Sequence, residues 1–446
     1  MTEAECEKNM LKQLLAFVIL NLALVSSSHA VLTIEITQGV TGASPIAIVP
    51  FAWTGNGAPP QQIDSIVAAD LQRSGFFQPL PEQDLVARPH SANQVNFTNW
   101  RALNVDHLVV GRMQAMSDDT FQVQFQLLDV YKQTQLAGYS IRSTKSDLRR
   151  TAHQISDIIY KTITGQPGAF DTRIAYVTVT QNQKKEKTYH LAVADSDGYN
   201  EQIVYESKHP LMSPSWAPDG QRLVYVSFSR GRPEVYIQNI VTRQFERIVA
   251  FKGINSAPVF SPDGSKLALT LSKDGNPEIY ILDMATKNLT RVTRNYAIDT
   301  EPAWMPDGKA IVFTSDRGGS PQIYRIDVNA QGATGRAKRL TFEGGYNARG
   351  AVSPDGRYLA MVHRENGNYR IAVQDLKAGH FRVLTNSRLD ESPSFSPNGS
   401  MIIYATEDNY RGVLAAVSVD GRSQQRLSLR TGDVREPAWS PFKSRQ

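Results

Sequence analysis

Cysteine is almost missing from this sequence of 446 residues, which contains only Cys6. A single cysteine cannot form an intrachain disulfide or a multi-cysteine metal site. The sequence also lacks the Gly-x-Ser-x-Gly, His-Glu-x-x-His and glycine-rich phosphate-binding motifs of hydrolases, metalloproteases and nucleotide-binding enzymes. Its eight histidines have no metal-ligand spacing, and His153 is expected to be a packed or surface residue. These absences predict a protein that is not an enzyme and needs no cofactor.

The sequence has little net charge and no long apolar run. Lys and Arg number 48 against 43 Asp and Glu, and this net charge of +5 is too scattered to indicate a nucleic-acid partner. The apolar stretch 14–25 is too short to cross a bilayer. It lies between a short basic lead and Ser28-His29-Ala30, which predicts a signal peptide over residues 1–30, with Met10 as the true start. The mature protein is therefore expected to be exported and soluble, meeting membranes only through partners.

What the sequence does contain is a repeat of the form Pro-x-aromatic-Ser-Pro-Asp-Gly, present six times with drift. Its second prolines stand at 218, 262, 306, 354, 397 and 441, so the steps are 44, 44, 48, 43 and 44 residues. Pro-Asp-Gly predicts a tight turn, and short apolar runs typical of strands follow it. This period predicts a six-bladed β-propeller over residues 169–446. The aromatic residue of each repeat is expected to pack between neighbouring blades.

The two ends of the repeat array predict how the ring closes. The last repeat, around Pro441, has no following strands, so it is expected to complete the blade that begins near Thr172. Closure of this kind removes exposed sheet edges. Within that first blade, the residues 195–198 resemble a calcium loop, and a hairpin turn explains them equally well.

Residues 31–168 differ from the repeats and predict a small α/β domain. Strands are expected at 33–36, 46–51, 108–111, 121–127 and 136–141 from their alternating or continuous apolar pattern. Helical spacing of apolar residues appears over 63–71 and again over 148–163. The segment 165–168, rich in glycine and proline, is the expected hinge to the propeller.

Several stretches together resemble one protein family. They are the hinge sequence 168–177, the segment 210–216, the repeat portions 257–258 and 300–304, and the helical segment 63–75. With the signal peptide and the α/β domain, they resemble the TolB family of periplasmic Tol-Pal proteins over essentially the whole mature chain. The resemblance implies a monomeric, non-enzymatic adaptor that links the outer-membrane lipoprotein Pal to the C-terminal domain of inner-membrane TolA. It further implies roles in outer-membrane invagination during cell division and in outer-membrane integrity, and colicins as foreign ligands.

The resemblance also implies two binding regions. The Pal-binding surface is assigned to one mouth of the propeller, where the family's contact positions correspond to Ile254, Ala257, Thr300 and Glu301. Blade equivalence adds Met212, Ser213, Arg349, Glu391, Arg435 and Glu436, for about half of which packing or solvated charge is the expected role. The TolA-binding segment is assigned to residues 31–42, including Thr33, Ile34, Glu35, Ile36, Gly39 and Gly42. Its composition predicts a segment that docks or comes loose, and Pal binding is expected to favour the docked state.

Two other functions are compatible with a propeller. A periplasmic sensor of a small molecule or sugar would use acids at the channel mouth, and this chain has candidates there in Asp299, Glu301, Asp390, Glu391 and Glu436. The same acids suit a protein partner with a basic patch, and the channel is also a place for a cation. A peptidase of the prolyl oligopeptidase kind would need a further hydrolase domain of about 200 residues with a nucleophile elbow.

Overall fold

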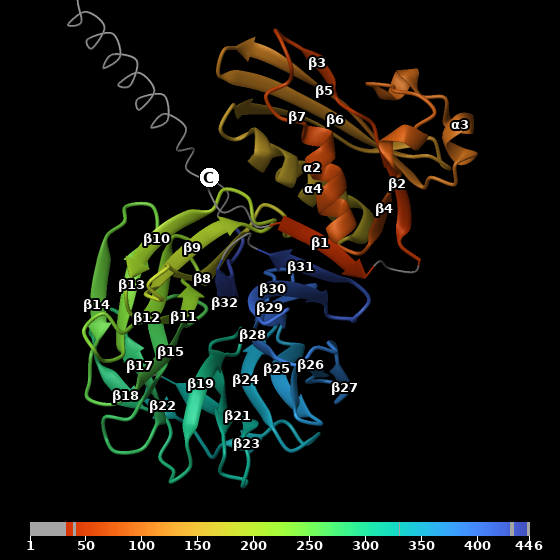
Figure 1. Cartoon of the computed structure of the whole chain (residues 1–446). Helices are drawn as coiled ribbons and strands as arrows, with labels where there is room; N and C mark the ends of the chain where they lie inside the picture. Colours follow the sequence, from red (N-terminus) through yellow and green to blue (C-terminus); the bar gives the residue numbers. More distant parts are fainter. Residues whose placement is uncertain (1–32, 39–41, 330, 429–431, 444–446) are drawn as a thin grey trace, which may run out of the picture.

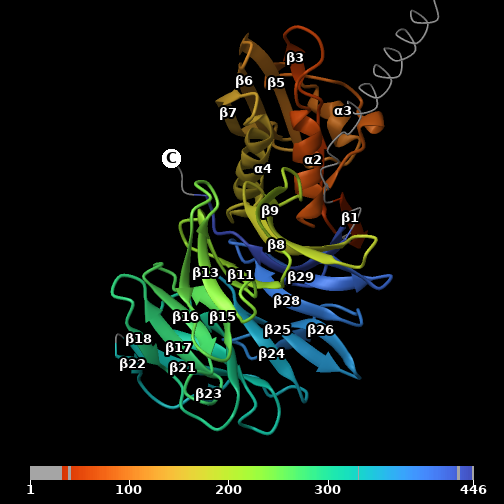
Figure 2. The ribbon, with the colours of Figure 1, turned by 60° about the vertical axis from the view of Figure 1, so that its left-hand side comes forward.

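The computed structural model describes residues 33–38, 42–329, 331–428 and 432–443. An N-terminal α/β domain lies beside a six-bladed β-propeller (Figure 1), as the sequence predicted. Figure 2 shows the α/β domain over the part of the propeller that contains β8, β9 and β29. Among the described residues, no helix combines the length and hydropathy needed to cross a membrane.

The α/β domain is a mixed sheet with two helices packed on one face. Its strands run in the order β4-β2-β5-β6-β7, with β3 also paired to β5. The strands are β2 (Ser44–Ile48), β3 (Ala52–Thr54), β4 (Phe77–Pro79), β5 (His107–Ser117), β6 (Thr120–Asp129) and β7 (Thr134–Thr144). The helices are α2 (Ile63–Arg73), the short α3 (Phe97–Arg101) and α4 (Leu148–Thr164), with single 3-10 turns at Glu82–Asp84 and Ala92–Gln94.

Side-chain alternation in β6 fixes which face of this sheet is buried. Phe121, Val123, Phe125 and Leu127 share one face and pack against α2 and α4 in the main core of the domain. Helix α4 ends at Gly165, whose φ of 77° is the left-handed conformation that closes a helix end without strain. The predicted strand and helix patterns of this region are confirmed, with ends that differ by a few residues.

Six sheets form the propeller, and each blade is numbered here in ring order with its strands given from the inside outward. Blade 1 contains β32 (Asp433–Trp439), β8 (Arg173–Gln181), β9 (Lys187–Asp195) and β10 (Gln202–Ser207), and blade 2 contains β11 (Leu211–Trp216), β12 (Arg222–Ser227), β13 (Glu234–Asn239) and β14 (Phe245–Val249). Blade 3 contains β15 (Asn255–Phe260), β16 (Lys266–Leu271), β17 (Glu278–Asp283) and β18 (Leu289–Arg291).

The remaining blades follow the same order. Blade 4 contains β19 (Asp299–Trp304), β20 (Ala310–Ser315) and β21 (Gln322–Asn329), which pairs with both β22 (Gly332–Ala333) and β23 (Lys338–Arg339). Blade 5 contains β24 (Asn347–Val352), β25 (Tyr358–Glu365), β26 (Asn368–Asp375) and β27 (Phe381–Val383). Blade 6 contains β28 (Asp390–Phe395), β29 (Met401–Asp408), β30 (Arg411–Ser418) and β31 (Gln424–Ser428).

The ring closes as predicted, because the C-terminal β32 pairs antiparallel with β8, the first propeller strand in the sequence. Neighbouring blades are joined through the repeat aromatics. The indole Nε1 of Trp216 in blade 2 donates to the carbonyl of Ala438 in blade 1 at 3.0 Å, and Trp304 in blade 4 donates to the carbonyl of Val259 in blade 3 at 3.3 Å. The predicted packing of these aromatics between blades is therefore confirmed.

One predicted strand has a partner that the sequence did not indicate. Strand β1 (Thr33–Gln38) does not join the sheet of the α/β domain, and instead pairs antiparallel with β31 at the outer edge of blade 6 (Figure 1). Blade 6 is therefore a five-stranded sheet whose outermost strand comes from the start of the described chain.

Candidate functional site

The predicted Pal-binding residues lie where the inner strand of each blade begins, and every inner strand has the same irregularity there. The register against the second strand shifts in all six blades, so that each inner strand carries a β-bulge. One residue of each bulge has a positive φ between 47° and 60° although none is glycine. We call these residues the bulge ring: Ser213, Ala257, Glu301, Arg349, Ser392 and Glu436.

The bulge has a local cause in the sequence. In five blades the residue after the bulge is proline, for example Pro302 after Glu301, and proline has no N–H to donate to the neighbouring strand. A bulge leaves this position outside the hydrogen-bond ladder. Blade 5 has Gly350 in place of proline, and there a side chain would approach Leu359 and Ile323 to 3.2 and 3.4 Å. Leu359 belongs to the same blade and Ile323 to blade 4, so this position has little room for a side chain.

The bulge ring lies at the end of the propeller strands that points away from the α/β domain. The turn after the inner strand of blade 6 reaches that domain, since Asn398 Nδ2 donates to the carbonyl of Pro167 at 2.9 Å. Inner strands of six residues span about 17 Å at a rise of about 3.3 Å per residue. We call the end where the inner strands begin the mouth, and it is not covered by the α/β domain.

A network of charged side chains connects four neighbouring blades at the mouth. The guanidinium of Arg349 in blade 5 pairs with the carboxylate of Glu436 in blade 1, reaching past blade 6. In blade 4, the carboxylate of Glu301 accepts hydrogen bonds from the backbone N–H of Arg349 at 2.9 Å and from Thr314 Oγ1 at 2.8 Å. Burial works to lower the pKa of Arg349, but the carboxylates of Glu436, Glu301 and Glu391 outweigh it and raise that pKa. Burial and repulsion from Glu436 raise the pKa of Glu391.

Exposed apolar side chains lie at the same end of the propeller as the Arg349–Glu436 pair. Met212 and Ile254 are 42% and 43% exposed, and Tyr296 is fully exposed. The loops that lead into the inner strands, or that join the second and third strands at the same end, carry further exposed apolar residues: Phe251, Ile298, Phe342 and Tyr410. Exposed apolar side chains gathered at one end of a protein mark a candidate surface for binding another protein.

All ten predicted mouth residues lie at equivalent places at the start of the inner strands, with Ile254 one residue before β15. Of these, Glu436 is 8% exposed and pairs with Arg349, so these two charges partly serve the propeller itself. Ser392 was missed, although it precedes Pro393 as Glu301 precedes Pro302 and is therefore equivalent to it in the repeat. Tyr296, Phe342 and Tyr410 were missed because nothing in the repeat distinguishes their loops.

Two of the acids expected at the channel mouth are not accessible to a ligand. Asp299 and Asp390 are both fully buried. Asp299 accepts a two-pronged contact from Arg317 at 2.6 and 2.8 Å, and Asp390 accepts hydrogen bonds from Thr385 and Ser387. Arg317 lies in the β20–β21 loop of the same blade, whereas Thr385 and Ser387 lie in the segment that joins blades 5 and 6. Both carboxylates therefore hold loops of the propeller in place, because buried charge requires such partners. The sugar-sensor interpretation therefore loses two of its five candidate acids.

The predicted TolA-binding residues Thr33, Ile34, Glu35 and Ile36 all belong to β1. Their backbones pair with β31, with Thr33 opposite Ser428 and Ile36 opposite Gln425. Gly42 has a φ of 90°, a conformation that glycine adopts without strain. Gly39 and the residues 31–32 lie outside the described part of the chain.

One group of side chains in the described ranges has the composition of a metal site: Asp70, His153 and Asp197, at the joint between the domains. Both carboxylates already have cationic partners, since Arg73 pairs with Asp70 at 2.8 Å and Arg149 pairs with Asp197. A divalent cation would have to displace Arg149 and share the site with Arg73, so we interpret the group as an ionic cluster. Asp197 lies in the hairpin turn between β9 and β10, which supports the hairpin interpretation of residues 195–198.

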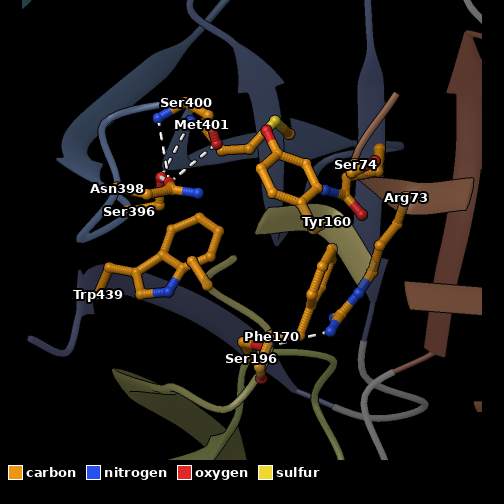
Figure 3. A pocket seen from close by; sticks show the side chains of 12 residues that line it. Arg73, Ser74, Tyr160, Phe170, Ser196, Ser396, Asn398, Ser400, Met401 and Trp439 are labelled. Carbon is orange, nitrogen blue, oxygen red and sulfur yellow. Dashed lines mark hydrogen bonds between the residues drawn. The ribbon is translucent and has the colours of Figure 1, made fainter. Parts of the chain in front are cut away.

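A small cavity adjoins this joint and is lined by both domains (Figure 3). Arg73, Tyr160 and Phe170 face Asn398 and Trp439 across it. Its volume of about 40 Å³ exceeds the 10–15 Å³ that one water needs and is well below the roughly 150 Å³ of a cavity that holds benzene. The cavity has room for water and does not suit an organic ligand.

Comparison with known proteins identifies the family. A model of the TolB amino-terminal domain matches residues 32–136, and a model of the TolB beta propeller domain matches residues 160–443. The chain belongs to the TolB family. The Tol-Pal system protein TolB of Nitrosococcus oceani is 55% identical over 415 residues, which cover 93% of this chain and 94% of that protein. TolB of Thioalkalivibrio sulfidiphilus is 56% identical over 433 residues, covering 97% and 98%.

A solved TolB structure supports the same assignment. The crystal structure of TolB from Acinetobacter baumannii matches with a TM-score of 0.85 and 45% identity, over 92% of this chain and all of that one. Both the fold and the relatives therefore make this chain a Tol-Pal system protein of the TolB family, a family of the cell envelope that works with other Tol-Pal components.

Proposed function

We propose that this TolB family member is a non-enzymatic periplasmic adaptor that binds the lipoprotein Pal at the mouth of its propeller. In this role it connects Pal in the outer membrane to TolA in the inner membrane, and so serves outer-membrane invagination in cell division and envelope integrity. The observation that carries the proposal is the mouth itself, where several exposed apolar and aromatic side chains lie at the same end of the propeller as the paired charges of Arg349 and Glu436. Exposed apolar patches mark surfaces that bind other proteins, and aromatic residues are frequent hot spots in them.

The structure suggests which substitutions test the mouth most cleanly. Glu301→Ala would also remove the acceptor for the Thr314 hydroxyl and one of the two acceptors for the Arg349 N–H, so a loss of binding could reflect a disturbed blade. Glu301→Gln keeps an acceptor and removes the charge. Tyr296→Ser changes a fully exposed side chain, so the fold should not depend on it. Val241→Ser is the matched control, because Val241 is 69% exposed in the turn between β13 and β14, at the other end of the blade.

The test is a calorimetric titration of the protein with the soluble domain of Pal. We expect saturable one-to-one binding, weakened about 5- to 30-fold by Tyr296→Ser and by Glu301→Gln, as is usual for interface hot spots. Val241→Ser should bind like the unaltered protein. Absence of binding with both proteins folded would contradict the proposal and favour the alternative of a small-molecule or sugar sensor in the channel.

We further propose that residues 31–42 are the segment that engages TolA, and that Pal binding favours the docked form of this segment. In support, β1 forms the outer edge of blade 6, while Glu391 at the mouth belongs to β28, the inner strand of the same sheet. Coupling requires that Pal bind the docked and undocked forms with different affinity. Deleting residues 31–42 should therefore weaken Pal binding, and an unchanged Pal affinity would show that the two sites are independent.

A further inference from the structure

Five ionisable side chains meet at the joint between the two domains, three of them buried and two, Arg149 and Asp197, partly buried. Helix α2 contributes Asp70 and Arg73, helix α4 contributes Arg149 and His153, and the β9–β10 turn of the propeller contributes Asp197. The side chains of Asp70 and His153 are 1% and 2% exposed. Buried charges are costly unless they are paired, so the arrangement of this interdomain charge cluster is informative.

His153 lies between a carboxylate of its own domain and a carboxylate of the propeller. Its Nδ1 is 2.7 Å from Asp70 Oδ2, which is a short hydrogen bond. Its Nε2 is 3.6 Å from Asp197 Oδ2 and has no hydrogen-bond partner in the described structure. The two arginines hold the carboxylates in place, because Arg73 bonds Asp70 and Arg149 bonds Asp197. Arg73 also reaches Ser196 Oγ in the propeller at 3.2 Å.

This geometry distinguishes the two protonation states of the imidazole. In a neutral ring, Nδ1–H donates to Asp70 and the lone pair of Nε2 points toward the Asp197 carboxylate, which is repulsive. In the imidazolium form both nitrogens are donors, and each faces a carboxylate on a different domain. The charged ring therefore satisfies both domains at once, and the neutral ring satisfies only the α/β domain.

We propose that His153 is a proton-dependent latch, which as an imidazolium holds the α/β domain to the propeller through Asp70 and Asp197, and which loosens the joint when it loses its proton. The contact to Asp70 lies within the α/β domain and persists when the domains separate. Any preference of the docked form for the proton must therefore come from the propeller, where Asp197 faces Nε2.

The titratable groups around His153 support this direction. Burial works to lower the pKa of His153, but attraction and hydrogen bonding from Asp70 and attraction from Asp197 outweigh burial and the opposing charge of Arg73, so the pKa is raised. Asp195 of the propeller also interacts with the ring, and Arg149 faces it through Asp197. Only the carboxylates of the propeller, Asp197 and Asp195, are brought to the ring by docking, and their attraction favours the proton in the docked form. On this basis the latch closes at low pH and opens as pH rises.

The experiment follows the joint in the full chain by hydrogen–deuterium exchange at pH 6 and pH 9, corrected for intrinsic exchange. The peptides to follow contain the end of α2 and the turn at residues 196–198. We expect the equilibrium constant for opening the joint to be larger at pH 9 than at pH 6. The increase should be about tenfold for each pKa unit by which docking raises the pKa of His153. His153→Gln should lose this pH response, whereas His209→Gln, which removes an exposed histidine far from the joint, should retain it.

A nuclear magnetic resonance titration of the histidine-labelled protein provides the second measurement. The imidazole of His153 should titrate above the ordinary histidine value of about 6.5. Asp197→Asn, which removes the propeller carboxylate without removing the ring, should lower that pKa and reduce the pH response of exchange. The proposal is overturned if His153 titrates at or below the ordinary value, or if the unaltered protein and His153→Gln open equally at both pH values. The Asp197→Asn comparison keeps the test decisive should His153→Gln not fold.

Discussion

Replacing Asp157 by asparagine should invert the order of stability between acidic and neutral pH. The carboxylate of Asp157, on α4, accepts hydrogen bonds from the backbone N–H groups of Phe170 at 2.8 Å and Asp171 at 3.2 Å, and so holds the start of the propeller against the helix. Burial nevertheless raises the pKa of Asp157 from 3.8 to about 6, against the effect of these hydrogen bonds. The folded state therefore binds the proton more tightly than the unfolded state.

The sign and size of the effect follow from this shift. The contribution of Asp157 to the free energy of unfolding is greatest below about pH 4. It is lost as pH rises through 6, because the folded protein must then hold a partly buried charge. A shift of about two units corresponds to about 2 to 3 kcal/mol after allowance for solvent screening. Asp157→Asn does not titrate, but its single amide oxygen leaves one of the two backbone donors less well satisfied, which costs about 1 kcal/mol.

Urea unfolding at pH 3 and pH 7.5 measures both contributions. At pH 3 the unaltered protein should be the more stable by about 1 kcal/mol, and at pH 7.5 the Asp157→Asn variant should be the more stable by about 1 to 2 kcal/mol. Asp118→Asn, a change at an exposed position between β5 and β6, should show no such crossing. An equal stability difference between the protein and Asp157→Asn at both pH values would refute the reasoning.

Three further outcomes are expected. Trp216→Leu removes the indole bond to Ala438 and leaves space between blades 1 and 2, so the free energy of unfolding should fall by about 2 to 4 kcal/mol in urea titrations. Asp263→Ala should lower the free energy of unfolding by less than about 1 kcal/mol at pH 7, because the carboxylate is exposed. Hydrogen bonds from Ser261 and Ser265 lower the pKa of Asp263 from 3.8 to about 2. In acid unfolding the difference between the protein and this variant should therefore vanish as pH falls through that range. Deleting the residues 33–38 should expose the edge of β31 and accelerate amide exchange there, and unchanged exchange would contradict the pairing.

The repeat could be predicted because its chemistry is local. Pro-Asp-Gly specifies a turn within three residues, and the constant period carries that turn around the ring without any knowledge of distant contacts. The family resemblance assigned Glu301 to one mouth of the propeller, and the repeat extended that assignment to the equivalent position Arg349. A proline inside a strand, such as Pro302, indicates an edge strand or a bulge, and β19 has both features.

The features that escaped prediction depend on contacts between distant residues. Nothing in the sequence of β1 indicates that its partner is β31, nearly 400 positions later in the chain. The interdomain cluster brings His153 against Asp70 and Asp197, and no spacing pattern links these three positions. His153 was expected to be a packed or surface residue, and the structure confirms packing, but only the fold shows which carboxylates it packs between.

The α/β domain is attached to the propeller at both of its ends, and the two attachments differ in kind. At the start of the described chain, β1 is held by backbone pairing along an exposed sheet edge, which a competing strand or partner can replace. At the other end, helix α4 leads through the hinge into β8, and the charges of Asp70, Arg73 and Asp197 close the joint beside it. Because β1 contributes none of those charges, it can leave blade 6 while the joint stays closed. The two attachments can therefore be tested separately, the first by deleting the residues 33–38 and the second by changing Asp197.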